Sequence, residues 1–178
     1  MRKIIVTEFM SLDGVIENPG WSMPYWNETI SAFKAEETNT CDALLLGRVT
    51  YEGFAAAWPQ SEDEGAVYMN SVQKYVVSTT LDRADWNNTQ IISANVADEI
   101  KTLKAQAGKD ILVYGSGKLL ETLMAHDLVD SYRILLYPVV LGEGQRFFPN
   151  GSTATLNLVR SEPVGGGVMA LVYEPKRA

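Results

Sequence analysis

Three segments of the sequence place small or hydroxylated residues directly after short apolar runs. Gly47-Arg48-Val49-Thr50 follows ALLL, Ser78-Thr79 follows KYVV, and Gly115-Ser116-Gly117-Lys118-Leu119 follows ILVY. N–H groups at the start of a helix can bind an anion, and an arginine can add two charge-assisted hydrogen bonds to it. Glycine lets the backbone approach a ligand closely. One such segment is often only a turn, but three at successive strand ends favour a ligand with several phosphates, such as a dinucleotide.

Two better-known nucleotide motifs are absent. The GSGK at 115–118 lacks the upstream glycine and the following Ser or Thr of a P-loop, and the first apolar run leads into SLDG rather than GxGxxG. Any nucleotide site in this chain is therefore of another type.

Two carboxylates and two tryptophans are candidates for contact with a substrate. Asp13 in SLDG and Glu143 in LGEGQ can orient a substrate or act on it, although a turn residue and a solvated loop carboxylate are the alternatives. Trp21 and Trp26 can wall a flat ring or serve as core or rim aromatics. No residue stands out as the acid that protonates an acceptor, so water is the expected proton source.

Composition excludes several classes of protein. The net charge of −7 argues against nucleic-acid binding, which needs a basic stripe. One cysteine, Cys41, and one histidine, His126, exclude a disulfide and a Cys/His zinc site, so no metal is expected, and they lack the third member of a nucleophile triad. No run approaches the roughly 20 apolar residues of a membrane helix. We expect a cytoplasmic protein.

Apolar runs alternate with helical patterns along most of the chain. Helices are predicted at 28–38 with Asn27 as N-cap, at 49–58 ending before Pro59, at 97–107 and at 118–128, and 61–65 is predicted to be a solvated acidic loop. This order predicts one domain, 1–178, with a mostly parallel sheet covered by helices on both faces. The expected strands are 3–10, 43–47, 74–79, 89–93, 110–115, 133–142 and a closing pair at 154–162 and 168–175.

Five blocks in this order resemble the dihydrofolate-reductase superfamily: SLDG (11–14), DALLLGRVTYEGFAAAWP (42–59), KYVVSTTL (74–81), ILVYGSGKLLETLMAHDLVD (111–130) and YPVVLGEGQRFF (137–148). Within it the chain looks most like the riboflavin-biosynthesis reductase (RibD C-terminal) domain and its stand-alone relatives. The resemblance covers nearly the whole chain. It implies a three-layer α/β fold, a mostly parallel sheet with an antiparallel C-terminal strand, and NADPH across the strand ends.

The resemblance also implies places for the cofactor. Arg48 of the Gly47–Thr50 block, with Ser78 and Thr79, would lie near the adenosine 2′-phosphate. Gly115 through Leu119 would lie under the pyrophosphate, and Ile16 beside the nicotinamide. The resemblance further implies a homodimer. The apolar run at 133–141 and the two strands after it are the candidate edge of the sheet that a dimer would bury.

The sequence departs from the family pattern at two places. The glycine-rich turn usually begins with two glycines, often joined by a cis peptide, whereas here the pair is Gly115-Ser116. Dihydrofolate reductases hold the pterin with a carboxylate on the first helix, and the aligned residue here is Thr29, next to Glu28. The resemblance therefore implies an NADPH-dependent reductase of a small heterocyclic or ribosylamino-pyrimidine substrate. Folate reduction and a non-catalytic nucleotide-binding role are the alternatives.

Overall fold

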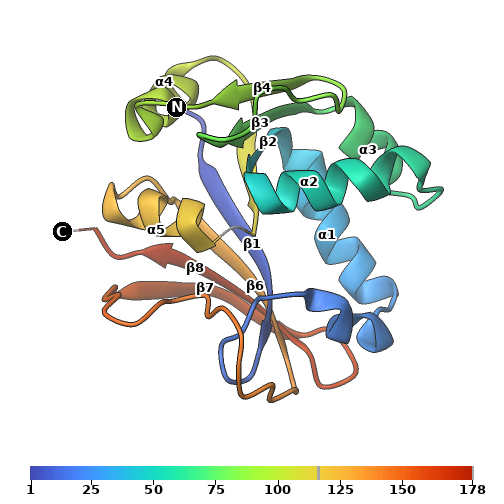
Figure 1. Cartoon of the computed structure of the whole chain (residues 1–178). Helices are drawn as coiled ribbons and strands as arrows, with labels where there is room; N and C mark the ends of the chain where they lie inside the picture. Colours follow the sequence, from blue (N-terminus) through green and yellow to red (C-terminus); the bar gives the residue numbers. More distant parts are fainter. Residues whose placement is uncertain (116, 178) are drawn as a thin grey trace.

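Eight strands form one sheet in the computed structural model, which describes residues 1–115 and 117–177 (Figure 1). The strand order is β4-β3-β2-β5-β1-β6-β8-β7. All pairs are parallel except those of β8, which runs antiparallel to both β6 and β7. The strands are β1 (Ile4–Ser11), β2 (Cys41–Gly47), β3 (Gln73–Val77), β4 (Thr89–Ile92), β5 (Asp110–Tyr114), β6 (Ser131–Tyr137), β7 (Leu156–Pro163) and β8 (Met169–Pro175).

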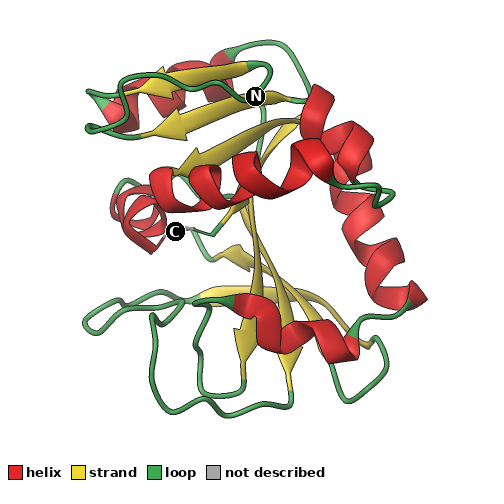
Figure 2. Cartoon of the chain, turned by 45° about the vertical axis from the view of Figure 1, so that its right-hand side comes forward, coloured by secondary structure: helices red, strands yellow, loops and turns green. Residues whose placement is uncertain are grey.

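Helices cover both faces of this sheet, as the ribbon shows in two views (Figures 1 and 2). α1 (Glu28–Thr40), α2 (Arg48–Ala57) and α3 (Ala66–Ser71) pack on one face, while α4 (Val96–Ala105) and α5 (Gly117–Ala125) pack on the other. Two 3-10 segments, η1 (Pro19–Tyr25) and η2 (Trp58–Gln60), complete the chain. The predicted three-layer α/β architecture with an antiparallel C-terminal strand is confirmed.

Most predicted elements lie within a few residues of the observed ones, and three differ. The strand predicted at 133–142 ends at Tyr137, since Pro138 has no N–H to continue the ladder, and the chain then runs as a loop to residue 155. The short α3 was not expected. Pro59 lies inside η2 rather than after a helix end. The Asn27 cap is confirmed, because its side chain accepts hydrogen bonds from the N–H groups of Thr29 and Ile30.

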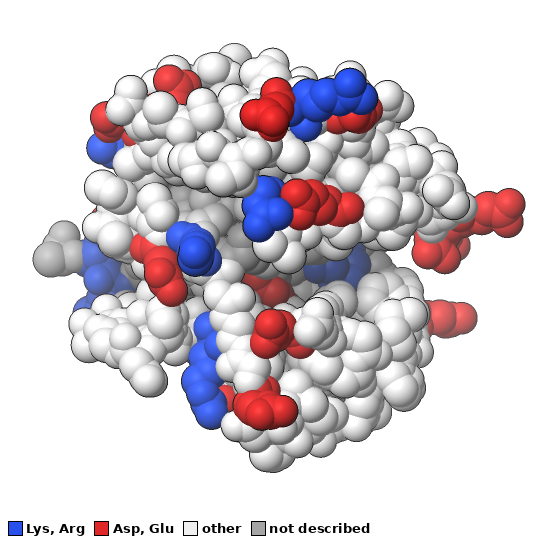
Figure 3. Space-filling model, viewed as in Figure 1, with Lys and Arg blue, Asp and Glu red and all other residues white. Residues whose placement is uncertain are grey.

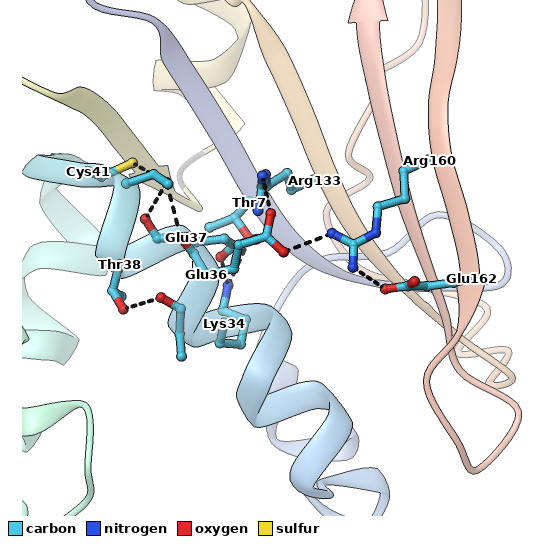
Figure 4. A network of polar contacts seen from close by, with 11 residues as sticks. Thr7, Lys34, Glu36, Glu37, Thr38, Cys41, Arg133, Arg160 and Glu162 are labelled. Atoms are coloured by element: carbon cyan, nitrogen blue, oxygen red, sulfur yellow. Dashed lines mark hydrogen bonds and ion pairs between the residues drawn. The ribbon is translucent and has the colours of Figure 1, made fainter.

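A charged cluster ties α1 to the C-terminal strands (Figure 4). Glu36 accepts from Arg133 of β6 at 2.9 Å and from Arg160 of β7 at 2.8 Å, and both guanidinium groups lie over the Phe33 ring. These hydrogen bonds, that from Arg160 foremost, lower the pKa of Glu36. The cluster holds α1 against β6 and β7.

The central strands separate toward their carboxyl ends. β1 pairs with β5 only as far as Thr7, opposite Tyr114, but it stays paired with β6 as far as Ser11, opposite Tyr137. The last residues of β1 therefore have a free edge on the β5 side. Ligands of open α/β sheets bind in the crevice beyond such strand ends. The space-filling view shows a hollow on this face, between α2 above and the η1 segment below (Figure 3).

Within residues 1–115 and 117–177, no helix is both long and apolar enough to cross a membrane.

Candidate functional site

The sheet brings the three predicted cofactor segments together. Gly47 ends β2 opposite Val77, the last residue of β3, and Leu46 lies opposite Tyr114, the last residue of β5. Because neighbouring strands are about 4.8 Å apart, the turns after β3, β2 and β5 form one continuous row at the carboxyl ends of the strands. Ser116, one of the predicted cofactor residues, lies outside the described residues, and so does the question of a cis peptide before it.

The turn after β5 is shaped by its two glycines. Gly115 has φ +58°, and a Cβ there would lie 2.9 Å from Oγ1 of Thr50, so both the backbone angle and the space favour glycine. A Cβ on Gly117 would lie 1.5 Å from Nε2 of Gln145. The Gln145 side chain thus reaches from the 138–155 loop to the start of α5. Because Gly117 has no side chain, another group can approach its backbone closely, and binding of a pyrophosphate would require the same.

The two residues after Gly117 differ in exposure. Lys118 is exposed, whereas Leu119 is 4% exposed and belongs to the core beneath α5. Leu119 can therefore address a ligand only through its backbone.

Arg48 and Ser78 already have partners within the protein. Arg48 donates to both oxygens of Glu52, one turn along α2, at 3.0 and 2.8 Å, and both side chains are about half exposed. The Ser78 hydroxyl accepts from the N–H groups of Thr80 and Leu81 and keeps its own hydrogen to donate. Both groups lie in the row of strand-end turns and can still address a phosphate, Arg48 by exchanging its carboxylate partner for it. Of the other predicted residues here, Val49 and Thr79 are exposed and Thr50 is half-buried.

Asp13 joins the two loops on the far side of the cleft. Its carboxylate accepts from Ser11 Oγ at 2.6 Å and from the N–H groups of Leu141 and Gly142 at 3.2 and 2.8 Å. These hydrogen bonds, that from Ser11 foremost, lower the pKa of Asp13 to about 2. Its carbonyl accepts from Arg146. Asp13 is thus an ionised brace between SLDG and the 138–155 loop.

The remaining candidates lie around this brace. Glu143 is exposed and lines a shallow depression together with Glu17 and Asn18. Ile16 is 7% exposed and packs in the core beneath α5. Glu28 is exposed at the start of α1.

Aromatic side chains line the end of β6. The rings of Trp21, Tyr25 and Phe9 stand edge-on to the buried Tyr137 ring, with centroids 5.4, 5.6 and 5.8 Å away. Trp26 is 44% exposed and lies edge-on to Phe9 at 6.1 Å. Trp21 therefore has a packing role, and Trp26 keeps an open surface.

Sequence reasoning missed a buried polar group near the carboxyl end of β1. Glu8 is 9% exposed, and within the described residues its Oε1 has no hydrogen-bond partner. Burial raises the pKa of Glu8 to about 8, against the opposing effects of Lys34 and of the Gly115 N–H. A carboxylate within an otherwise apolar strand, near its carboxyl end, was the signal that could have identified it.

Lys34 of α1 lies on the other side of β1 from the core beneath α5. Its Nζ donates to Thr7 Oγ1 at 2.8 Å and to Glu37 Oε2 at 2.6 Å (Figure 4). The same atom lies 4.7 Å from the centre of the Tyr114 ring. Glu37 is fully buried. This pair reads in sequence as an ordinary surface ion pair three residues apart on a helix, so its contact with β1 could not be foreseen.

Comparison with protein families and curated proteins gives concordant matches. The family described as RibD C-terminal domain matches residues 2–170. The uncharacterized protein YyaP of Bacillus subtilis is 31% identical over 97% of this chain and 94% of its own length. YwjB of the same organism, also uncharacterized, is 27% identical over 97% of both chains.

Solved structures show the same fold at low sequence identity. A putative riboflavin biosynthesis protein from Shewanella is 24% identical with a TM-score of 0.80, covering 98% of this chain and 99% of the other. Dihydrofolate reductase from Enterococcus faecalis, complexed with NADP(H), is 16% identical with a TM-score of 0.66, covering 98% and 97%. A deaminase/5-amino-6-(5-phosphoribosylamino)uracil reductase from Thermotoga maritima is 13% identical with a TM-score of 0.69, covering 98% of this chain and 57% of the other.

Proposed function

This chain belongs to the family of RibD C-terminal domains, and from that premise we propose that it is an NADPH-dependent reductase of a small heterocyclic substrate of the ribosylamino-pyrimidine type. Among its relatives, the Thermotoga protein carries a uracil reductase activity in its name, and the Enterococcus protein was solved with NADP(H). The reductase class follows from the family. The cofactor and the substrate are the proposal.

The observation that carries the proposal is the turn at Gly115 and Gly117. At Gly117 the three atoms nearest to a Cβ position all belong to one flexible side chain, Gln145, so movement of that side chain would expose the backbone of the turn. The assigned residues define one direction for NADPH along the carboxyl ends of the strands. Its 2′-phosphate would lie by Arg48 and Ser78 at β2 and β3, its pyrophosphate over the turn after β5, and its nicotinamide over the free edge of β1.

When bound, the cofactor supplies the hydride, and the protein's residues position and shield the reactants. The aromatic residues at the end of β6 and the exposed face of Trp26 give a flat ring an apolar surface. Asp13 fixes the SLDG turn against the 138–155 loop, so these two walls of the cleft move together.

The proposal is tested by cofactor binding followed by turnover. NADPH should quench the protein's tryptophan fluorescence, and oxidation of NADPH should then appear with the ribosylamino-pyrimidine substrate and not with dihydrofolate. Turnover of dihydrofolate would favour folate reduction instead. Binding without turnover of any compound in a broad substrate panel would favour a non-catalytic nucleotide-binding role.

We expect Arg48→Ala to weaken NADPH binding by about 1.5–3 kcal/mol, the range for a charged hydrogen bond, and to leave NADH binding nearly unchanged. The reason is that only NADPH carries the 2′-phosphate. Titration of both cofactors by fluorescence measures the difference. Glu52→Gln is the matched control. It frees Arg48 from its ion-pair partner, so the affinity for NADPH should stay the same or increase. An equal loss for both cofactors in Arg48→Ala would contradict this role for Arg48.

We also propose a homodimer that forms through β7, the edge strand of the sheet. Leu158 and Val159 on this strand are 54% and 58% exposed, and an unpaired edge with apolar side chains favours association. Light scattering at tens of micromolar should give twice the mass of the 19.6 kDa chain, and Leu158→Lys should shift the protein toward the monomer. A monomeric native protein under these conditions would contradict the proposal.

A further inference from the structure

Glu8 lies where β1 and β5 separate. Thr7 is the last β1 residue paired with β5, so Glu8 is the first residue on the free edge. Its Oε1 lies 3.8 Å from the position that a Cβ on Gly115 would take. The carboxyl group is therefore beneath the turn assigned to the pyrophosphate, on the strand assigned to the nicotinamide.

The buried Oε1 of Glu8 is unexplained by the fold. No described residue forms a hydrogen bond with it, and a buried polar atom without a partner destabilises the fold. This oxygen lies beside the turn assigned to the cofactor, so a group bound there would lie near it. A neutral carboxyl offers such a group one donor and one acceptor.

The charges around Glu8 favour its neutral form. Lys34 of α1 is the cation that acts on it, but Lys34 is held by Glu37 on the opposite face of β1. Tyr114 of β5 stays neutral because burial raises its pKa. The loop after β6 contributes the neutral Gln145, and Lys118 of α5 is exposed. Glu8 thus keeps its proton near neutral pH until a new positive charge approaches.

We propose that the protonation of Glu8 is linked to the redox state of the cofactor: its carboxyl group is neutral when NADPH is bound and ionised when NADP⁺ is bound. This inference rests on the proposed function. The oxidised nicotinamide ring carries a positive charge that the reduced ring lacks, and a nearby positive charge favours the carboxylate. Successive side chains of a strand point to opposite faces, so Glu8 lies on the α5 side of β1 and Phe9 on the α1 side. The proton that Glu8 loses when NADP⁺ binds therefore passes to solvent.

The link between the protonation of Glu8 and the redox state of the cofactor can be measured without a substrate. The Kd values of NADP⁺ and NADPH are determined from pH 6.5 to 9 for the native protein and for Glu8→Gln. The 2′-phosphate titrates in both cofactors, so its effect cancels in the ratio Kd(NADP⁺)/Kd(NADPH). In the native protein this ratio should fall up to about tenfold per pH unit below the pKa of Glu8, and in Glu8→Gln it should stay flat.

Calorimetry gives a second measurement, which does not need the Glu8→Gln variant. At pH 7 the binding of NADP⁺ should release up to one proton, seen as a heat that depends on the ionisation enthalpy of the buffer, whereas the binding of NADPH should release none. Glu64→Gln, in the exposed loop before α3, is the control and should behave as the native protein. Equal proton counts for the two cofactors, or a slope that persists in Glu8→Gln, would overturn the role of Glu8. Failure of both cofactors to bind would instead overturn the proposed function.

Discussion

Gly117→Val is expected to abolish NADPH binding, at least 100-fold, and to leave the melting temperature of the free protein within a few degrees of the native value. A side chain at 117 would fill the space above the backbone that the proposed position of the pyrophosphate requires. Without a glycine there, the pyrophosphate could not approach the turn closely. The atom that a Cβ would meet is the amide end of Gln145. Because that end can swing away, the substitution strains the cofactor site more than the fold.

The same substitution at another helical glycine is the control. A Cβ on Gly53 of α2 would meet nothing within 4 Å, so Gly53→Val tests the cost of valine in a helix without the cofactor. Gly117 lacks the positive φ that would make every substitution there strained. Fluorescence titration and a thermal melt on both variants separate the two effects. Unchanged NADPH affinity in a folded Gly117→Val protein would remove the main support for a dinucleotide at this edge.

Glu8→Gln is expected to change how the stability of the free protein depends on pH. The pKa of Glu8 is about 8 in the folded protein, against the ordinary value of 4.5 for an exposed glutamate in the unfolded chain. The folded state therefore holds the proton more tightly, and the stabilisation from Glu8 is complete below pH 4.5 and is lost as pH rises to about 8. That gap corresponds to roughly 4–5 kcal/mol. Glutamine does not titrate, so the variant should lack this loss.

Chemical denaturation of both proteins at pH 5, 6, 7, 8 and 9 measures this difference. The free energy of unfolding of the native protein should decline relative to that of Glu8→Gln until about pH 8 and then run parallel to it. Parallel curves across the whole range would show that Glu8 titrates normally. The variant should also be the more stable protein at pH 9, where most of the native Glu8 is buried and charged.

The fold could be predicted from sequence because its signals are local. Apolar runs, an Asn27 cap and alternating element types are each read within a few residues, and the glycines at 47, 115 and 117 lie where the strand ends predicted them. The error at 138–142 arose because the apolar run continues past Pro138, which breaks the ladder. α3 was missed because its six residues are held by distant contacts, such as the hydrogen bond from Tyr68 to the Cys41 carbonyl.

The chemistry of the cleft was less predictable, for a different reason. Asp13 reads as a possible catalytic group, but only the fold reveals the backbone N–H groups of Leu141 and Gly142 that engage it across more than 120 residues of sequence. Glu8 reads as an interruption of an apolar strand. Its burial and its position at the divergence of β1 and β5 are properties of the sheet order, which places strands distant in sequence side by side.

The contact between Gln145 and Gly117 has an evolutionary consequence. The two residues share one volume, so neither can change freely while the other is kept. A relative that carries a side chain at the position of Gly117 should carry a shorter residue at that of Gln145, and its cofactor must be held differently. A relative that keeps the glycine is free to vary its partner among flexible side chains. An alignment of many such chains should therefore show the two positions varying together, although they lie 28 positions apart, with most of α5 and all of β6 between them.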